Sequence, residues 1–156
     1  MPARLTIIAV GKLKERHWRD AAEEYLKRLK AYATIEVVEV KDRDLSRDAA
    51  RAVADEGADI LDAVPAGAHV VALDSGGRQM SSEQFAEWLS AHGLEGRSHV
   101  AVLVGGTAGL SRDVLDRAEE KLSLGKITLP HQLARVVVLE QLYRAFRIMR
   151  NEPYHR

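Results

Sequence analysis

Three turns in this chain of 156 residues carry side chains and backbone groups that could bind a small ligand. They are Leu73–Gly77, Gly105–Gly109 and Leu124–His131, and the first two follow apolar runs. In Gly105–Gly109, which opens a helix, backbone N–H groups without covering side chains could approach a carboxylate, a ribose or a phosphate. Asp74 could bind a ribose. The same residues also fit a tight strand-to-helix turn and an Asp that caps or turns the backbone, and the run lacks the spacing of a dinucleotide-binding motif.

Cysteine, histidine and serine residues do not occur at the spacings that are typical of metal sites or of catalytic nucleophiles. The chain has no cysteine, which excludes disulfides, thiolate ligands and a cysteine nucleophile. His131 and Glu140 do not match a metal-binding helix pair, and the histidines at 17, 69, 92 and 99 are scattered. Ser81 and Ser111 fit helix caps before they fit nucleophiles. We therefore expect no metal site and no hydrolytic triad.

The charge balance limits the kinds of partner. With 23 basic and 23 acidic residues the formal net charge is zero, so no bulk field attracts DNA, RNA or anionic lipid. Any contact with nucleic acid must be local, and RNA phosphate could be met by a basic loop and by arginines near the end of the chain. These are Lys12, Lys14, Arg16, Arg135, Arg144, Arg147, Arg150 and Arg156. The alternative for each residue is a solvated charge that pairs with a local acid.

Alternating strand and helix patterns predict how the three turns are positioned. Strands are expected at Leu5–Val10, Thr34–Val40, His69–Leu73 and Val100–Val104, with helices between them. Crossovers of this length make neighbouring strands parallel, so the predicted fold class is α/β with a mostly parallel sheet and flanking helices. The last two runs are apolar without alternation and should be central, whereas glutamates in Thr34–Val40 indicate an edge. Ligands in such sheets bind beyond the carboxyl ends of the strands, where the turns stand.

Polar residues mark where helices should begin. Asp44 or Ser46 can cap the second helix, Ser81 and Gln84 form a capping box, and Ser111 can cap the helix after the glycine turn. The residues expected to point inward from that last helix are Leu115, Ala118 and Leu122.

The longest helix is expected just after Pro130, a residue suited to the first turn of a helix. Leu133–Met149 contains no Gly or Pro, and its apolar residues cover more than one narrow stripe, so this helix should be buried on more than one side. Charges within it must be paired, reach solvent, or meet a ligand or partner. They are Arg135, Glu140, Arg144 and Arg147. Such a helix in a small protein suggests a subunit interface.

Length and composition predict a single domain over residues 1–156. The hydrophobic content of 46% is enough for one core. The apolar run Leu5–Val10 is too short for a signal peptide or a membrane span. We therefore expect a cytoplasmic protein with no membrane partner.

The last third of the sequence is similar to that of a known family. Thr128–Val136, Leu139–Ala145 and Pro153–Arg156 resemble the SPOUT-class ribosomal RNA large subunit methyltransferase H family. The resemblance runs nearly end to end and includes Ala9–Lys12, Leu73-Asp74, Gly76-Gly77, Val104–Gly106 and Gly109-Leu110. It implies an α/β trefoil knot in the carboxyl-terminal part, a homodimer packed partly through the last helix, and S-adenosylmethionine bound in the knot.

The resemblance also implies a reaction and a set of cofactor contacts. The family methylates N3 of a pseudouridine in 23S rRNA on the assembled 70S ribosome. The positions that match its cofactor contacts are Leu73, Gly105, Leu124, Gly125, Lys126, Ile127, Thr128 and Leu129. This chain departs from the family pattern at Thr107, where proline is usual, and at Gly125, where serine is usual.

For catalysis we assign three residues near the end of the chain. Arg135 would stabilise the anion that develops on the uracil ring, His155 would accept the N3 proton, and Tyr154 would shape the base pocket. The tail would come from the partner subunit, which makes the site composite. Two other readings stay open, namely a related SPOUT enzyme that acts on tRNA or another rRNA position, and a non-catalytic ribosome-binding factor with the same fold.

Overall fold

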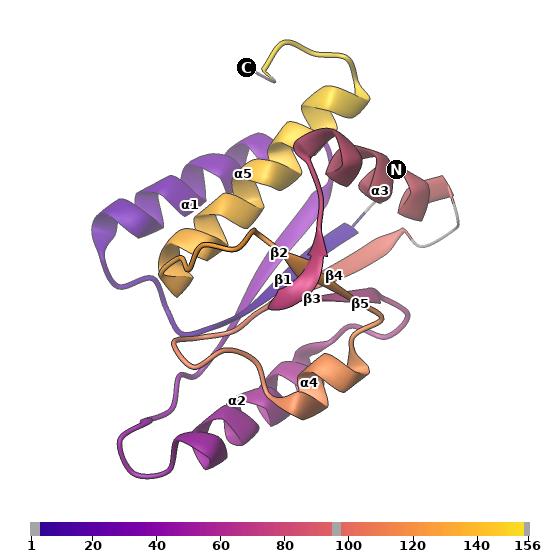
Figure 1. Cartoon of the computed structure of the whole chain (residues 1–156). Coiled ribbons are helices and arrows are strands. Elements are labelled where there is room, and N and C mark those ends of the chain that lie inside the picture. Colours follow the sequence, from indigo (N-terminus) through magenta and orange to yellow (C-terminus); the bar gives the residue numbers. More distant parts are fainter. Residues whose placement is uncertain (1–3, 95–97, 155–156) are drawn as a thin grey trace.

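A five-stranded parallel sheet forms the middle layer of the computed structural model, which describes residues 4–94 and 98–154 (Figure 1). The strand order is β2-β1-β4-β3-β5, and every neighbouring pair is parallel. The strands are β1 (Arg4–Val10), β2 (Thr34–Val40), β3 (His69–Gln79), β4 (His99–Val104) and β5 (Glu120–Ser123). The predicted α/β class with a parallel sheet and flanking helices is confirmed, while the trefoil knot stays a prediction.

Helices cover both faces of the sheet. One face carries three of them and the other carries two, as Figure 1 shows above and below the strands. The first group is α1 (Arg16–Leu29), α3 (Ser82–Leu94) and α5 (His131–Met149), and the second is α2 (Ala49–Ala63) and α4 (Arg112–Arg117). Within residues 4–94 and 98–154, no helix combines the length and the apolar character that crossing a bilayer needs.

The apolar strands are explained by this double cover. In β1, Leu5, Ile7 and Ala9 join the core under α1, α3 and α5, while Ile8 and Val10 join the core over α2 and α4. A strand buried on both faces cannot alternate apolar with polar residues. β4 lies at the centre of the sheet and β2 at one edge, as predicted.

The structure corrects the sequence prediction between α4 and the last helix. Leu122 was expected to continue the helix after Ser111, but α4 ends at Arg117 and the chain forms β5. Within α4, Val114 is fully buried, whereas Leu115 is only half-buried. β5 has four residues, two of them charged, and therefore lacks the β-branched signal of a strand. Only its pairing with β3 makes it one.

Helix caps agree with the sequence in two places and differ in one. Ser81 and Gln84 form the predicted capping box, with N–H···O distances of 2.9 and 3.1 Å. Ser111 accepts a hydrogen bond from the backbone N–H of Val114 and so caps α4. The cap of α2 is instead Asp48, because Asp44 is already engaged in a turn with the N–H of Ser46.

α5 is the central helix of its layer. It packs between α1 and α3 and buries Leu139, Leu142 and Phe146 completely, which confirms that more than one side is covered. Its charged side chains are paired, as burial requires. The pairs are Arg135 with Glu39, Arg144 with Glu140, and Arg147 with Glu152.

β3 bends around β5 at Asp74–Gly77. The sequence predicted a turn there that ends the strand, but the strand resumes after the bend, so that Leu122 pairs with both Leu73 and Arg78. Gly77 lies against the backbone of β5, and a Cβ placed on it would come within 2.7 Å of the carbonyl carbon of Lys121. No real Cβ makes such a contact with backbone, so glycine is required at this position.

We predict that Gly77→Ala lowers the free energy of unfolding by roughly 2–3 kcal/mol or more, because the methyl group overpacks a backbone that cannot move aside. Urea denaturation followed by circular dichroism measures the change. Gly76→Ala is the matched control, since its Cβ would meet only the flexible carboxylate of Asp74 at 3.2 Å. Equal stability of the two variants would contradict the close approach of β3 and β5.

Candidate functional site

The three turns singled out in the sequence meet in one cleft at the carboxyl ends of the strands. The cleft has a volume of about 450 Å³, within the usual range of ligand pockets. Leu73 contributes one wall, Gly105 and Gly109 a second, and the run Leu124–Leu129 a third. All eight positions matched to the family's cofactor contacts line this cleft.

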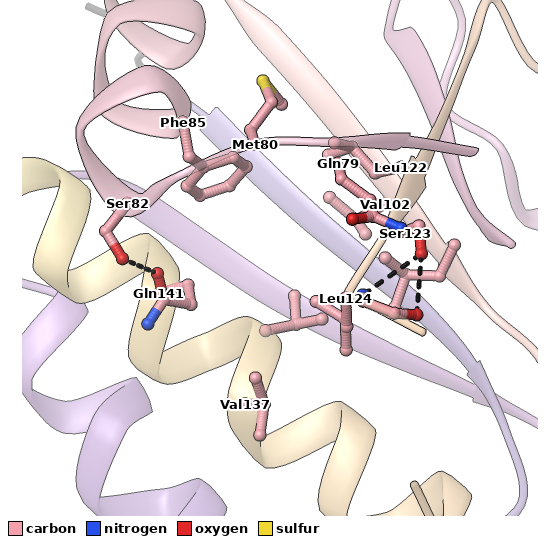
Figure 2. Close-up of a pocket in the computed structure, with 13 residues that line it drawn as sticks. Gln79, Met80, Ser82, Phe85, Val102, Leu122, Ser123, Leu124, Val137 and Gln141 are labelled. Carbon is pink, nitrogen blue, oxygen red and sulfur yellow. Dashed lines mark hydrogen bonds between the residues drawn. The ribbon is translucent and has the colours of Figure 1, made fainter. Parts of the chain in front are cut away.

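A second, largely apolar cavity of about 300 Å³ adjoins the cleft (Figure 2). The two cavities share the wall formed by Leu73 and Leu122–Gly125. Met80 and Phe85 lie on one side of the second cavity and Val137 of α5 on the other. The Oγ of Ser82 donates a hydrogen bond of 2.7 Å to the Oε1 of Gln141, which joins α3 to α5 there (Figure 2). A flat ring with apolar faces would find matching surfaces in this space.

The glycine turn after β4 is closed on itself. Gly109 donates its N–H to the carbonyl of Gly106 at 3.1 Å and has a positive φ of 80°, which glycine adopts without strain. A Cβ at Gly105 would lie 2.6 Å from the carbonyl carbon of Gly109, so this position also requires glycine. The cleft therefore has a wall of bare backbone, which a ligand can approach closely.

The loop after β5 is held at its start and exposed further on. The hydroxyl of Ser123 accepts a hydrogen bond from the N–H of Gly125 and donates one to its carbonyl, both at 3.1 Å. Gly125 has a φ of 123°, a conformation suited to glycine. Leu124 and Ile127 are 39% and 76% exposed, the two large exposed apolar side chains among the described residues. Both border the cleft and would be covered by a ligand or a partner.

These features fit a nucleoside-type cofactor of the kind that the sequence led us to expect. Apolar side chains can hold a base, and unencumbered backbone N–H and C=O groups can bind its polar edge and a ribose. Asp74, which could bind a ribose or turn the backbone, lines the cleft, and its carboxylate accepts the N–H of Gly76 at 3.1 Å, as the second alternative predicts.

A polar cavity of about 280 Å³ lies next to the cleft. Gly106 and His131 line both spaces. Lys12 and Lys14, from the basic loop after β1, line the polar cavity and are exposed. Glu15, Asp42 and Glu56 line the same cavity, so the charge around it is mixed, and RNA contact at the two lysines stays a prediction.

Arg135 is buried, with 3% of its side chain exposed. Its Nη1 binds the carboxylate of Glu39 at 2.6 Å, and its Nη2 donates to the carbonyls of Val10 and Gly11. The guanidinium therefore joins the first turns of α5 to the ends of β1 and β2. Its Nε–H is buried and has no hydrogen-bond partner within residues 4–94 and 98–154. A catalytic role for Arg135 stays a prediction.

The tail folds back onto α5, away from the cleft of its own chain. The hydroxyl of Tyr154 donates to Glu140 at 3.0 Å, and its ring meets that of Tyr143 edge-on. Burial, with hydrogen bonds to Tyr25 and Glu140, raises the pKa of Tyr154 above its ordinary value. His155, assigned as proton acceptor, lies outside the described residues, as does Arg156.

Four of the arginines proposed for RNA contact are paired with acids of the same chain, which is the alternative given for them. They are Arg16, Arg135, Arg144 and Arg147. Arg150 is exposed and stacks over the ring of Tyr32 at 4.6 Å. In the described part of the chain, most of these arginines are therefore used within the protein.

Sequence reasoning missed the second cavity. It placed His131 at the end of the turn Leu124–His131 and otherwise weighed it only as a metal ligand, whereas the structure places it where the cleft meets the polar cavity. Met80, Phe85 and Gln141 come together with Leu124 because β3 bends around β5. No local pattern signals that bend, so the sequence alone could not have identified them.

Comparisons with known proteins point to one family. The family model described as "Predicted SPOUT methyltransferase" matches residues 3–155. The ribosomal RNA large subunit methyltransferase H of Carboxydothermus hydrogenoformans is 47% identical, covering 97% of this chain and 99% of that protein. The protein of the same name from Bacillus cytotoxicus is 48% identical with the same coverage.

A solved structure supports the fold. "The structure of a probable methylase family protein from Haemophilus influenzae Rd KW20" superimposes with a TM-score of 0.56. The match covers 95% of this chain and 67% of that chain at 17% sequence identity, so it concerns the fold alone.

We predict that Arg135→Met lowers the free energy of unfolding by about 2–4 kcal/mol, because it leaves Glu39 without its counter-charge and two carbonyls without a donor. Glu39→Gln should cost less, since the amide can still accept a hydrogen bond. Urea denaturation measures both changes. Arg51→Met is the control, because that side chain is 79% exposed. An Arg135→Met protein as stable as this control would show that the buried pair does not hold the fold.

Proposed function

This chain belongs to the SPOUT methyltransferase family, and we propose that it transfers a methyl group from S-adenosylmethionine to N3 of a pseudouridine in 23S rRNA. The substrate proposed is the assembled 70S ribosome, which places the enzyme in the cytoplasm. The names of the relatives support methylation of large-subunit ribosomal RNA. The exact base and the cofactor are our inference from the family resemblance and the site.

One observation carries the proposal: the three loops expected to contact the cofactor come together in a single cleft. They are separated by some 30 and 20 residues in the chain, so their meeting depends on the whole sheet order. The cleft joins the apolar cavity of Figure 2 on one side and the lysine-lined polar cavity on the other. A cofactor between the two would have an apolar environment for adenine and an RNA-facing side for the methyl group.

When bound, S-adenosylmethionine supplies an activated methyl group on a sulfonium. The chain must orient the acceptor base and help its N3–H to lose a proton. Arg135 is the proposed cation. Its guanidinium is buried against Glu39 and does not line the cleft, so this role requires the side chain to be uncovered when the RNA binds. His155 is the proposed proton acceptor, and Tyr154 shapes the base pocket. The hydroxyl of Tyr154 donates to Glu140, and its raised pKa means that it stays a donor at alkaline pH as well.

The geometry of α5 favours a site shared between two subunits of a homodimer. Ala134 lines the cleft, while Tyr154 packs on Tyr143, about 13 Å farther along the helix at 1.5 Å per residue. Within one chain, the described part of the tail thus lies away from the cofactor loops. A partner's tail can cover the cleft if the two chains pack through α5, and it would bury Ile127, which is 76% exposed.

Two other functions remain as outcomes of the tests. A SPOUT enzyme acting on tRNA or another rRNA position would use the same cofactor cleft, and a non-catalytic ribosome-binding factor would keep the fold without the reaction. The cleft's eight matching positions favour an enzyme over a binding factor.

We predict that calorimetric titration shows saturable binding of S-adenosylmethionine, and that labelled methyl is transferred to 70S ribosomes much faster than to free 23S rRNA. Mass spectrometry of nuclease fragments should place the methyl group on a pseudouridine. Gly105→Ala should weaken cofactor binding at least about tenfold, because its Cβ opens the glycine turn. Thr107→Ala is the control, since Thr107 is exposed on the same turn.

Each other outcome has a definite meaning. Methylation of tRNA or of a different rRNA base would select the related SPOUT enzyme. Ribosome binding without cofactor binding would select the non-catalytic factor and reject the proposed reaction.

We predict that mixed dimers of two inactive variants regain activity if the site is shared. One chain carries Gly105→Ala and an intact tail, and the other has intact loops and ends after Pro153. Random mixing should restore about a quarter of wild-type activity, because half of the dimers then contain one complete site. Tags of different affinity allow the heterodimer to be isolated. An inactive, purified heterodimer would show that each chain completes its own site.

A further inference from the structure

Two histidines that the sequence left scattered meet at the edge of the sheet opposite the cleft. His69 begins β3, His92 lies in the last turn of α3, and Glu120 begins β5. Their possible ligand atoms all lie within 4.8 Å of one another. The histidine rings are 4.1 Å apart between centroids, and both side chains are at least 93% buried. Residues 23 and 28 positions apart thus form one compact group.

The three side chains converge on one carboxylate oxygen. The Oε2 of Glu120 lies 2.5 Å from the Nε2 of His69 and 3.2 Å from the Nε2 of His92. Zinc holds imidazole nitrogen and carboxylate oxygen at about 2.0–2.2 Å, which places neighbouring ligand atoms slightly more than 3 Å apart. The distance between His92 and Glu120 already agrees with this spacing. The distance between His69 and Glu120 is too short, but the side chain of Glu120 is 33% exposed, and a small outward shift would lengthen it.

The surrounding contacts are those of an outer shell that orients metal ligands. The Nδ1 of His69 is 2.6 Å from a carboxylate oxygen of Glu119, the carboxylate–histidine arrangement that fixes the ring of a ligating histidine. The indole N–H of Trp88 donates to Glu120 at 3.0 Å and holds that carboxylate in turn. Glu119 and Trp88 therefore orient His69 and Glu120 without being ligands.

We propose that His69, His92 and Glu120 form a binding site for a divalent transition metal of the zinc class. Two imidazoles and one carboxylate suit Zn²⁺ and not Mg²⁺ or Ca²⁺, which take oxygen ligands. The protein supplies three ligands, so water completes the tetrahedron on the side where Glu120 is exposed. The metal would join β3, α3 and β5 at their amino-terminal edge. This site lies apart from the cofactor cleft and does not depend on the proposed methyltransferase activity.

The first test uses the untagged full-length protein, stripped with chelator and titrated with Zn²⁺. We expect one Zn²⁺ per chain and a rise in melting temperature that Mg²⁺ does not produce. Co²⁺ in its place should give the intense visible absorption of a four-coordinate ion. A Co²⁺ spectrum that remains that of the hydrated ion, with no Zn²⁺ stabilisation, would overturn the proposal and leave a purely ionic cluster of His69 with Glu119 and Glu120.

Variants then assign the ligands. His92→Gln and Glu120→Gln should each weaken Zn²⁺ affinity by at least about a hundredfold, and Glu119→Gln, which only orients His69, by roughly ten- to a hundredfold. His17→Gln is the control, because His17 is an exposed surface histidine. Circular dichroism without metal checks that each variant is folded. If one of the two ligand variants does not fold, the other is enough for the test. Unchanged affinity in a folded ligand variant would overturn the site.

Discussion

The close contact between Gly77 and the backbone of β5 is the constraint on which the rest of the structure depends. Because no side chain separates them, β5 can lie inside the bend of β3 and pair with it on both sides of Asp74–Gly77. That position directs the loop after β5 toward Leu73 and the glycine turn, and it sets the start of α5. The cleft and the apolar cavity beside it are consequences of this one approach of two backbones.

A buried ion pair fixes the start of α5 against the other side of the sheet. Arg135 connects α5 to the ends of β1 and β2 through Glu39 and two carbonyls. Several arginines are similarly used within the chain, which agrees with a net charge of zero. If the substrate is a ribosome, the negative charge of its RNA supplies the long-range electrostatic attraction, and the protein needs only a local positive surface.

Local patterns in the sequence predicted what local physics determines. Burial on both faces makes Val100–Val104 a continuous apolar run, and the Ser81–Gln84 capping box depends on residues three apart. Both could therefore be predicted from the sequence. The sequence also predicted that the three ligand-binding turns share one edge, because parallel strands end together. β5, the bend at Asp74–Gly77 and the His69–His92–Glu120 group could not be predicted. Each arises from pairing between segments far apart in the chain, which leaves no periodic signal.

The late place of β5 in the chain has a consequence for how the protein folds. β5 must pair with a bend formed more than 40 residues earlier, and β4 must pair with β1, whose partner residues lie 95 positions earlier. Such non-local pairing is slow compared with the formation of a helix or a hairpin. A chain in which β5 has not docked does not hold the run Leu124–Leu129 beside Leu73 and the glycine turn, so it has no complete cleft.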